Sequence, residues 1–319
     1  MLSLPDFKEK KILFVFGDKD MENKLKFWND NIRLFKDGKP VNQLSCHKIL
    51  AVFIYGECSL TSVLIRNCMK YGISLILTRN NFEVYANMGL GAEGNTLLRQ
   101  RQYSMENNFE LAKNLIKNKI HNQFMLLSRA KKIKTPIKHY KISAQKIDTA
   151  TDAKQLLGIE GNHTKSYFQT YFKEVGWYRR MPRAKVDEIN VLMDIGYTLL
   201  LNFMDSILRL YGFDVYKGFY HTLFFQRKSL ACDMIEPFRC LIDASIVKMF
   251  NLKQLDPKDF KKKKGKDKVF LPYQKQGKYL KIFTETLMDH KEAIFDYTRT
   301  FYYSLINEKE GFPFFKLSN

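Results

Sequence analysis

The residues with the clearest potential for chemistry lie between Gly218 and Arg239, in the stretch GFYHTLFFQRKSLACDMIEPFR. Asp233 and Glu236 are three residues apart, so in a helix that begins at a capping Ser229 they would project from one face. His221 precedes them on an aromatic segment and is expected to reach the same spot. Carboxylates and imidazole are the ligands of a site for a divalent first-row metal, with Mn²⁺ or Mg²⁺ favoured as oxygen ligands dominate.

Pro237 follows the second acid directly. It has no N–H to donate to the carbonyl of Asp233, so the sequence predicts a kink in the helix where the two acids point. The stretch also permits a simpler interpretation, because a single histidine among aromatic residues more often packs in a core or forms a hydrogen bond.

A second candidate stretch runs from Leu156 to Tyr167 and reads LLGIEGNHTKSY. Glu160 lies between two glycines in a helical pattern. Glycine costs a helix about 1 kcal/mol relative to alanine, so the close approach of another backbone or of a ligand would explain the pair. Tyr167 would lie two turns further along the same face. The alternative for Glu160, and for the neighbouring His163, is a solvated side chain without a chemical role.

The charge of the chain indicates a polyanionic partner. The chain has 319 residues, enough for a large core, and a length that suggests about two domains. Its 53 Lys and Arg against 33 Asp and Glu give a net charge of +20 and a pI near 9.6. This balance favours nucleic acid first and an anionic membrane surface second. A content of 45% hydrophobic residues excludes a mainly disordered chain.

The sequence gives no sign of secretion or of membrane insertion. No apolar run approaches the ~20 residues of a membrane helix, and the N-terminus lacks the basic-then-apolar order of a signal peptide. We therefore expect a soluble cytoplasmic protein with no membrane partner. The cysteines are odd in number, scattered and without a CxxC pair, which argues against a disulfide framework and a zinc site.

Residues 1–88 are predicted to form a small β-rich domain. Short apolar runs separated by turn residues indicate the strands, and one amphipathic helix that starts at a capping Ser59 precedes the last two of them. The predicted strands are Lys11–Phe16, Leu25–Asn29, Ile32–Lys36, Pro40–Leu44, Lys48–Tyr55, Ser74–Thr78 and Phe82–Ala86. Because such short apolar strands need covering, we expect this domain to carry much of a dimer interface.

The glycine-rich segment from Asn87 to Asn95 is the expected boundary, and residues 89–319 form a larger helical domain. The overall class is therefore α+β. The predicted helices are Leu97 to about Lys132, Asp148–Phe172, the apolar Val186–Tyr211 stopped by Gly212, Leu230–Phe250 and Tyr279–Ile306.

A lysine-rich segment, DFKKKKGKDK, separates the last two of these helices. It is too charged to pack in a core. Both a solvated loop and an arm that binds DNA phosphates are compatible with it. The candidate phosphate ligands are Lys261, Lys262, Lys263 and Lys264.

Taken in order, the segments LLGIEG…Y, RRMPRAKVDEIN…GY, GFYH and RKSLACDMIEPFR resemble the first family of CRISPR-associated proteins, the integrase subunit of spacer acquisition. The upstream segment IYGECSLTSVLIRNCMKYGISLIL is similar to the end of that family's β domain. The resemblance extends from about Leu50 to Ile242.

The resemblance implies a sandwich-like N-terminal β domain, an all-α domain with one metal site, a homodimer, and a small second adaptation subunit that joins two dimers. The family's metal ligands fall on Glu160, His221 and Glu236, with Asp233 as an accessory acid and Mg²⁺ or Mn²⁺ as the ion. Glu236 stands where many members have aspartate, and Cys240 stands where a second proline is common.

The activity that the resemblance implies is the joining of 3′-hydroxyl ends of short duplex DNA to repeat DNA by transesterification. With water as the nucleophile the same site would be a nuclease. A metal-dependent nuclease without integration and a non-catalytic DNA-binding scaffold are the alternatives.

The remaining candidate DNA contacts are basic or aromatic residues near these motifs. Tyr167 would orient a phosphate or simply pack, and Arg227, Lys228 and Arg239 would hold phosphates or neutralise the acids. The motif YRRMPR is expected to form a DNA-facing patch of Arg179, Arg180 and Arg183.

Overall fold

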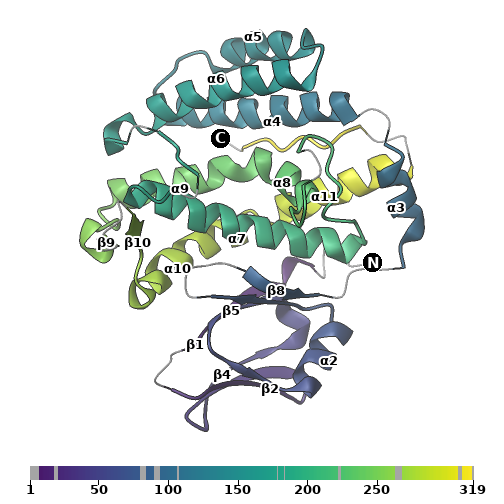
Figure 1. Cartoon of the computed structure of the whole chain (residues 1–319), viewed down its shortest axis with the longest axis vertical. Helices are drawn as coiled ribbons and strands as arrows, with labels where there is room; N and C mark the ends of the chain where they lie inside the picture. The colour runs from purple at the N-terminus through teal and green to yellow at the C-terminus, as the bar shows by residue number, and fades with distance from the viewer. Residues whose placement is uncertain are drawn as a thin grey trace. The chain divides into compact units, whose positions relative to one another are not determined.

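The computed structural model has an α+β fold (Figure 1). It divides into two compact units, of which the first contains Met1–Gln100 with Asn202–Asp214 and the second contains Arg101–Leu201 with Val215–Asn319. The structure describes residues 7–17, 21–79, 84–89, 94–105, 108–177, 179–182, 184–221, 224–262, 268–307 and 311–317.

The first unit is β-rich and contains two four-stranded sheets. One has the order β1-β5-β7-β8, in which only β8 is antiparallel to its neighbour, and the other has the order β4-β3-β2-β6. The bounds are β1 Lys11–Gly17, β2 Asn23–Trp28, β3 Asn31–Lys36, β4 Lys39–Ser45, β5 Ile49–Gly56, β6 Ser59–Leu60, β7 Ser74–Thr78 and β8 Val84–Met88. The predicted strands are therefore present, with bounds that differ by a few residues.

The two sheets and one helix, α2 (Ser62–Lys70), share a single apolar core. The helix contacts β2 of one sheet and β7 of the other, and its buried side chains are Leu64 and Cys68. The prediction that Ser59 caps this helix was wrong. The cap is Thr61, whose hydroxyl accepts from the backbone N–H of Leu64 at 3.2 Å, because the preceding residues pair with β2.

The end of helix α7 (Glu188–Tyr211) belongs to the β-rich unit. Asn95 donates to the carbonyl of Tyr211 at 2.9 Å, and the Asn87 amide donates to Asp205. The unit therefore needs residues far beyond the predicted boundary. Among the described residues α7 is also the one helix apolar and long enough to cross a membrane, but 83% of its most apolar window is buried within the protein, as in a core helix.

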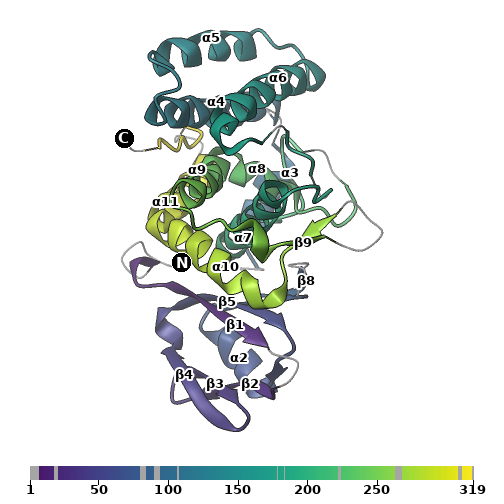
Figure 2. The same cartoon turned by 90° about the vertical axis from the view of Figure 1, so that its left-hand side faces the viewer.

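The second unit is helical. Helices α4, α5 and α6 lie together in one layer in both views (Figures 1 and 2), and α9 packs on α10. The bounds are α3 Thr96–Tyr103, which begins in the first unit, α4 Asn108–Arg129, α5 Pro136–Asp148, α6 Ala153–Tyr171, α8 Ser229–Ile235, α9 Arg239–Asn251, α10 Tyr273–Asp289 and α11 Lys291–Ile306. A two-residue ladder of β9 (Lys261–Lys262) and β10 (Val269–Phe270) accompanies them.

Three of the predicted helices are divided in the structure, and one of them is Leu230–Phe250, which the 3₁₀ turn Glu236–Phe238 separates into α8 and α9. The first is divided into α3 and α4, and the last is divided at His290 into α10 and α11. Helix α5 was missed, because its apolar residues are few and Ile137 and Ile142 are exposed. Helix α7 and its stop at Gly212, whose φ is +91°, were correctly predicted.

Close packing of α7 on α9 and α10 depends on Gly196. A Cβ at this position would lie 2.4 Å from Ile242 Cγ2 and 3.2 Å from the ring of Phe283. Glycine is therefore required by the approach of the neighbouring helices rather than by its backbone freedom.

We expect Gly196→Ala to lower the free energy of unfolding by about 1–3 kcal/mol, because the methyl group must displace two buried side chains. Gly277→Ala on α10 is the matched control: nothing lies within 4 Å of its Cβ, so alanine should stabilise the helix by about 0.5–1 kcal/mol. Urea unfolding followed by circular dichroism measures both. If Gly196→Ala and Gly277→Ala lose the same free energy of unfolding, the close approach of Ile242 and Phe283 to Gly196 does not explain the need for glycine.

Candidate active site

Helix α4 carries polar side chains on its buried face. Lys119 and Asn122 lie on the stripe that also buries Ile116 and Ile120. Asn122 donates to the carbonyl oxygens of Pro237 and Phe315, both at 3.1 Å, and its own oxygen accepts from the N–H of Leu317 at 3.0 Å. One turn earlier, Asn118 donates to and accepts from the backbone of Phe315. The helix therefore holds the extended segment 311–317 beside the turn that contains Pro237.

At Pro237, where the sequence predicts a kink, the α-helix is interrupted, although the backbone stays in the right-handed helical region. Helix α8 ends at Ile235, and Glu236–Phe238 form a single 3₁₀ turn before α9 begins. Ser229 is the first residue of α8 rather than its cap, and Lys228, at the cap position, gives the helix no side-chain capping hydrogen bond. The break places Glu236 at the start of the turn, buried to 4% side-chain exposure.

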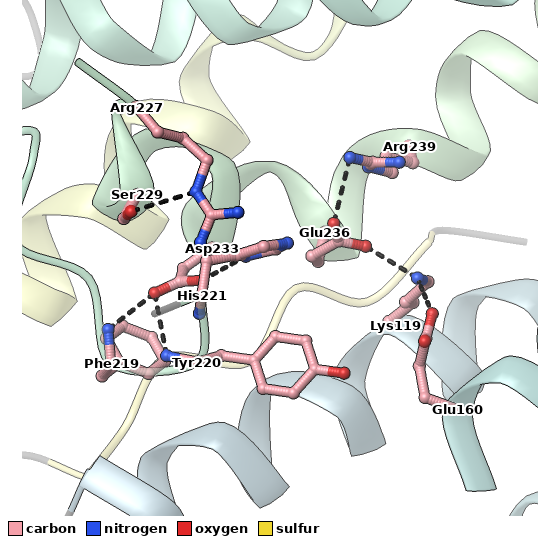
Figure 3. Close-up of polar contacts among 10 residues, drawn as sticks. All are labelled: Lys119, Glu160, Phe219, Tyr220, His221, Arg227, Ser229, Asp233, Glu236 and Arg239. Carbon is pink, nitrogen blue, oxygen red and sulfur yellow. Dashed lines mark hydrogen bonds and ion pairs between the residues drawn. The ribbon is translucent and has the colours of Figure 1, made fainter. Parts of the chain in front are cut away.

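The carboxylates of Glu160 on α6 and Glu236 meet at one cation, Lys119 (Figure 3). The Lys119 ammonium forms an ion pair with Oε1 of Glu160 and lies 2.7 Å from Oε2 of Glu236. Thr164 also donates to Glu160 Oε1, at 3.1 Å. The two acids that the sequence separates widely are thus brought to the same point.

Arg239 supplies the second cation for Glu236. Its Nη2 lies 3.1 Å from Oε1 of Glu236, and its guanidinium lies over the ring of Tyr197 at 4.8 Å. Burial alone would raise the pKa of Glu236, but Arg239, Lys119 and His221 together lower it to about 2. Glu236 is therefore ionised at neutral pH. Of the two roles expected for Arg239, the structure supports neutralisation of the acid.

Asp233 performs a different task from Glu236. Its Oδ2 accepts from the backbone N–H groups of Phe219 and Tyr220 at 2.7 and 3.0 Å, and its Oδ1 accepts from the N–H of His221 at 2.9 Å and contacts Nδ1 of that ring at 2.6 Å. A carboxylate has about four lone-pair sites, and all of them are engaged. The expected accessory metal ligand is therefore committed to the loop that carries His221 (Figure 3).

This arrangement fixes the orientation of the imidazole. With Nδ1 of His221 held by Asp233, Nε2 is the ring nitrogen left for another ligand. Gly218 makes the approach possible, because a Cβ there would lie 2.5 Å from Oδ2 of Asp233. The shared anionic spot expected for Asp233 and Glu236 does not form, since each acid faces its own partners.

The donor set fits a divalent cation. In the part of the chain that the structure describes, no three His, Cys, Asp or Glu side chains already form a metal-binding group. However, Glu160 and Glu236 converge on a positive charge, and Oε2 of Glu236 is buried without a hydrogen bond of normal geometry. Two carboxylates that require a cation, beside an oriented imidazole, are suited to Mn²⁺ or Mg²⁺. Convergence of His221 with both acids stays a prediction.

Tyr167 does not face solvent, and the idea that it orients a DNA phosphate is corrected. It is 1% exposed, and its hydroxyl donates to Asp243 at 3.0 Å. The hydroxyl of Tyr197 donates to the same carboxyl group at 2.5 Å. These residues form a buried hydrogen-bond network that joins α6, α7 and α9.

The predicted arginine patch is only partly accessible. Arg180 is paired with Asp194 at 2.5 Å and donates to Asn190 at 3.0 Å, so the expectation that its charge faces DNA is corrected. The reason is that Asp194 of α7 lies within ion-pair distance of the Arg180 guanidinium and holds it. Arg179 is exposed, and Arg183 lies outside the described residues.

The other basic candidates remain near the surface. Arg227 and Lys228 are partly exposed, and Nε of Arg227 donates to the hydroxyl of Ser229 at 3.3 Å. Lys261 and Lys262 are exposed on β9. Lys263 and Lys264 lie outside the described residues.

The two glycines beside Glu160 do not touch another backbone. A Cβ at Gly158 or Gly161 would meet nothing within 4 Å, so that explanation for the pair was wrong. Both glycines are exposed, and no contact in the structure requires either of them.

Reasoning from the sequence missed Lys119, Asn118 and Asn122. The signal was present: these polar residues occupy positions of α4 that the helical period assigns to the apolar stripe. A polar residue on such a stripe is usually paired when buried.

The chain matches the family model described as CRISPR associated protein Cas1 over residues 19–285. A relative from Thermodesulfovibrio yellowstonii (strain ATCC 51303 / DSM 11347 / YP87), described as a CRISPR-associated endonuclease Cas1, is 28% identical over 313 residues, which are 93% of this chain and 98% of the relative.

Solved structures share the fold. A casposase bound to an integration product superposes with a TM-score of 0.80 at 22% identity, covering 97% of this chain and 94% of that one. A chain of a Cas6-RT-Cas1–Cas2 complex gives a TM-score of 0.78 at 22% identity, covering 98% of this chain and 36% of that one.

The buried acid behind the site yields a prediction about pH. Burial raises the pKa of Asp243 from 3.8 to about 6, although hydrogen bonds from Tyr197 and Tyr167 oppose the change. The folded protein thus holds this proton to a higher pH than the unfolded chain. The contribution of Asp243 to stability is fully present below pH 4 and is lost as the pH rises to about 6, by as much as about 3 kcal/mol.

Asp243→Asn should therefore flatten the pH dependence of the free energy of unfolding between about pH 4 and 6.5. Urea unfolding at several pH values compares it with the native protein and with Glu285→Gln, which removes a carboxylate that is 62% exposed. Parallel pH profiles for the native protein and Asp243→Asn would show that the carboxyl group does not titrate in this range.

Proposed function

Because this chain belongs to the Cas1 family of CRISPR-associated proteins, we propose that it is a metal-dependent DNA integrase and endonuclease of CRISPR adaptation. It joins 3′-hydroxyl ends of short foreign DNA to repeat DNA by transesterification. The observation that carries this proposal is the meeting of Glu160 and Glu236 on a buried cation, in the same unit as an imidazole whose Nε2 is left available.

The cation would be held by Glu160, Glu236 and Nε2 of His221. When bound, it supplies charge that polarises the scissile phosphodiester and lowers the pKa of the attacking hydroxyl. Asp233 keeps the imidazole oriented through its contact with Nδ1, and Arg239 holds one oxygen of Glu236. These contacts fix two of the three donors before DNA arrives.

In the joining reaction, the oxygen of the 3′-hydroxyl forms a bond to phosphorus of the repeat strand, and the bond to the leaving 3′-oxygen breaks. The attacking hydroxyl loses its proton, and the leaving oxygen gains one. If water attacks instead, the same site cleaves DNA. The relative from T. yellowstonii is described as an endonuclease, and the casposase is bound to an integration product.

The proposed partners are DNA, a second copy of the chain and a small second adaptation subunit, in the cytoplasm. The net charge of +20 supports a DNA partner. A chain of similar fold occurs in a complex with Cas2, which supports the second subunit. The homodimer rests on the short strands of the first unit, whose exposed edges favour pairing.

A strand-transfer assay tests the proposed activity. The protein, the second subunit, a short duplex and a supercoiled plasmid are incubated in Mn²⁺ or in Mg²⁺. Joined products indicate an integrase, nicks without joining indicate a nuclease, and binding without either product indicates a scaffold.

Single substitutions of Glu160→Gln, Glu236→Gln and His221→Ala should abolish strand transfer and cleavage while leaving DNA affinity nearly unchanged. The reason is that affinity comes from the basic surface whereas these side chains act on the transition state. Asp233→Asn should lower the rate by about 10–100-fold, since it loosens the orientation of the imidazole. Glu285→Gln is the control for removal of a carboxylate elsewhere. If the His221→Ala variant has native activity in both Mn²⁺ and Mg²⁺, the assignment of His221 as a metal ligand is wrong.

We expect the segment Lys261–Lys264, here called the lysine arm, to bind the DNA backbone without recognising a base sequence. Replacing Lys261–Lys264 by alanine should weaken binding evenly across sequences and flatten the slope of log affinity against log salt by ~0.9 for each lost contact. A matched control makes the same change in net charge on the first unit, at Lys24, Lys26, Lys36 and Lys39. If the slope of log affinity against log salt is unchanged, the lysine arm is a solvated segment that does not contact DNA phosphates.

A further inference from the structure

Lys119 is a buried lysine with carboxylates from two different elements as its ionic partners. Its side chain is 8% exposed, and Glu160 and Glu236 are 14% and 4% exposed. Glu160 belongs to α6, and Glu236 belongs to the turn between α8 and α9. Figure 3 shows the ammonium between the two acids. The position that a shared metal ion would take between these oxygens is therefore held by a charge of this chain.

The three charges depend on one another. The ammonium is buried, and the carboxylates of Glu160 and Glu236 compensate its charge. Without a cation, two buried carboxylates would repel each other and would each lack the compensation that a buried charge needs. The lysine thus keeps the acids together in the absence of metal.

The oxygen of Glu236 that Lys119 contacts is the one a metal would need. Oε1 of Glu236 is already taken by Arg239, so Oε2, the oxygen beside Lys119, is the one left for a shared ion. On Glu160 the contacted atom is Oε1. A divalent cation and an ammonium cannot both lie close to the same pair of oxygens without strong repulsion.

We propose that Lys119 is an internal counter-cation of the metal-free site, which a divalent cation must displace from between Glu160 and Glu236. This inference rests on the proposed metal site. It makes metal binding an exchange of one cation for another rather than the filling of an open position.

Unsatisfied polar atoms near the pair offer partners for the displaced ammonium. Among the described residues, the hydroxyl of Tyr220 and Nε2 of His163 are buried without a hydrogen bond. Burial, with a contribution from Lys119, lowers the pKa of His163 to about 4, so its ring is neutral and adds no repulsion. A shift of a flexible lysine side chain toward either atom would leave the carboxylates to the metal.

The test uses the full chain and two lysines of the same helix. Lys119→Met removes the charge and keeps most of the apolar stem. Lys113→Met is the matched control, because Lys113 is 9% exposed at its side chain and donates to Glu110 at 3.0 Å and to the carbonyl of Asp148 at 3.3 Å. Calorimetric titration with Mn²⁺ gives the metal affinity, and thermal unfolding in EDTA and in Mn²⁺ gives the stability of each state.

The proposal predicts effects of opposite sign in the two states. Lys119→Met should bind Mn²⁺ between about 5-fold and about 150-fold more tightly than the native protein, the usual range of a coupling free energy. Its Tm should be lower than native in EDTA, and Mn²⁺ should raise it by more than it raises the native Tm. Lys113→Met should lose stability equally in both conditions and bind Mn²⁺ with native affinity.

Equal or weaker binding of Mn²⁺ by Lys119→Met would overturn the proposal, because the lysine would then stay in place or assist the metal. If the variant does not fold in EDTA, folding rescued by Mn²⁺ supports the exchange. Failure in both conditions, with Lys119→Gln behaving alike, overturns it.

Two further titrations separate this inference from the proposed function. If the native protein binds no Mn²⁺, or binds it equally well with Glu160→Gln or Glu236→Gln, the proposed metal site itself is wrong. If both substitutions weaken binding but Lys119→Met does not strengthen it, only the role of Lys119 is wrong.

Discussion

The buried carboxylate of Glu236 cannot stay ionised without positive charge beside it, and this requirement is the constraint on which the packing of the helical unit depends. Glu236 lies almost wholly out of water, and its ionised form requires positive charge on more than one side. Arg239 comes from the next turn of the same chain segment, but Lys119 must be brought from α4. The packing of α4 against the turn at Pro237 is therefore an electrostatic requirement as well as an apolar one.

Asp233 and Glu236 are only three residues apart, but their carboxylates have different partners in the structure. In an unbroken helix Asp233 and Glu236 would share one face and repel. In the structure, Asp233 instead organises the backbone of the His221 loop, whereas Glu236 faces the cations Lys119 and Arg239. Each carboxylate is therefore compensated by its own partners, and the two do not form one anionic spot.

The sequence predicted features that depend on local pattern. Strand periodicity located the β-rich unit, and the apolar run with Gly212 located α7, because burial and backbone rules act within a few residues. The interruption of the helix at Pro237 and the choice of Glu160 and Glu236 as candidate site residues followed from residue types. Helix α5 was missed because its apolar pattern is weak. The pairing of Lys119 was not predictable, since it joins α4 to α6 and to a distant turn, and no local rule describes such contacts.

The clamp of Asn118 and Asn122 on residues 311–317 has a consequence for biosynthesis. These residues leave the ribosome after every helix of the unit has been made, yet they contact the same asparagine that holds the carbonyl of Pro237. During translation Asn122 cannot form its hydrogen bonds to Phe315 and Leu317 until those residues have been made. The asparagine contacts beside the turn that carries Glu236 can therefore be completed only after residues 311–317 have been synthesised.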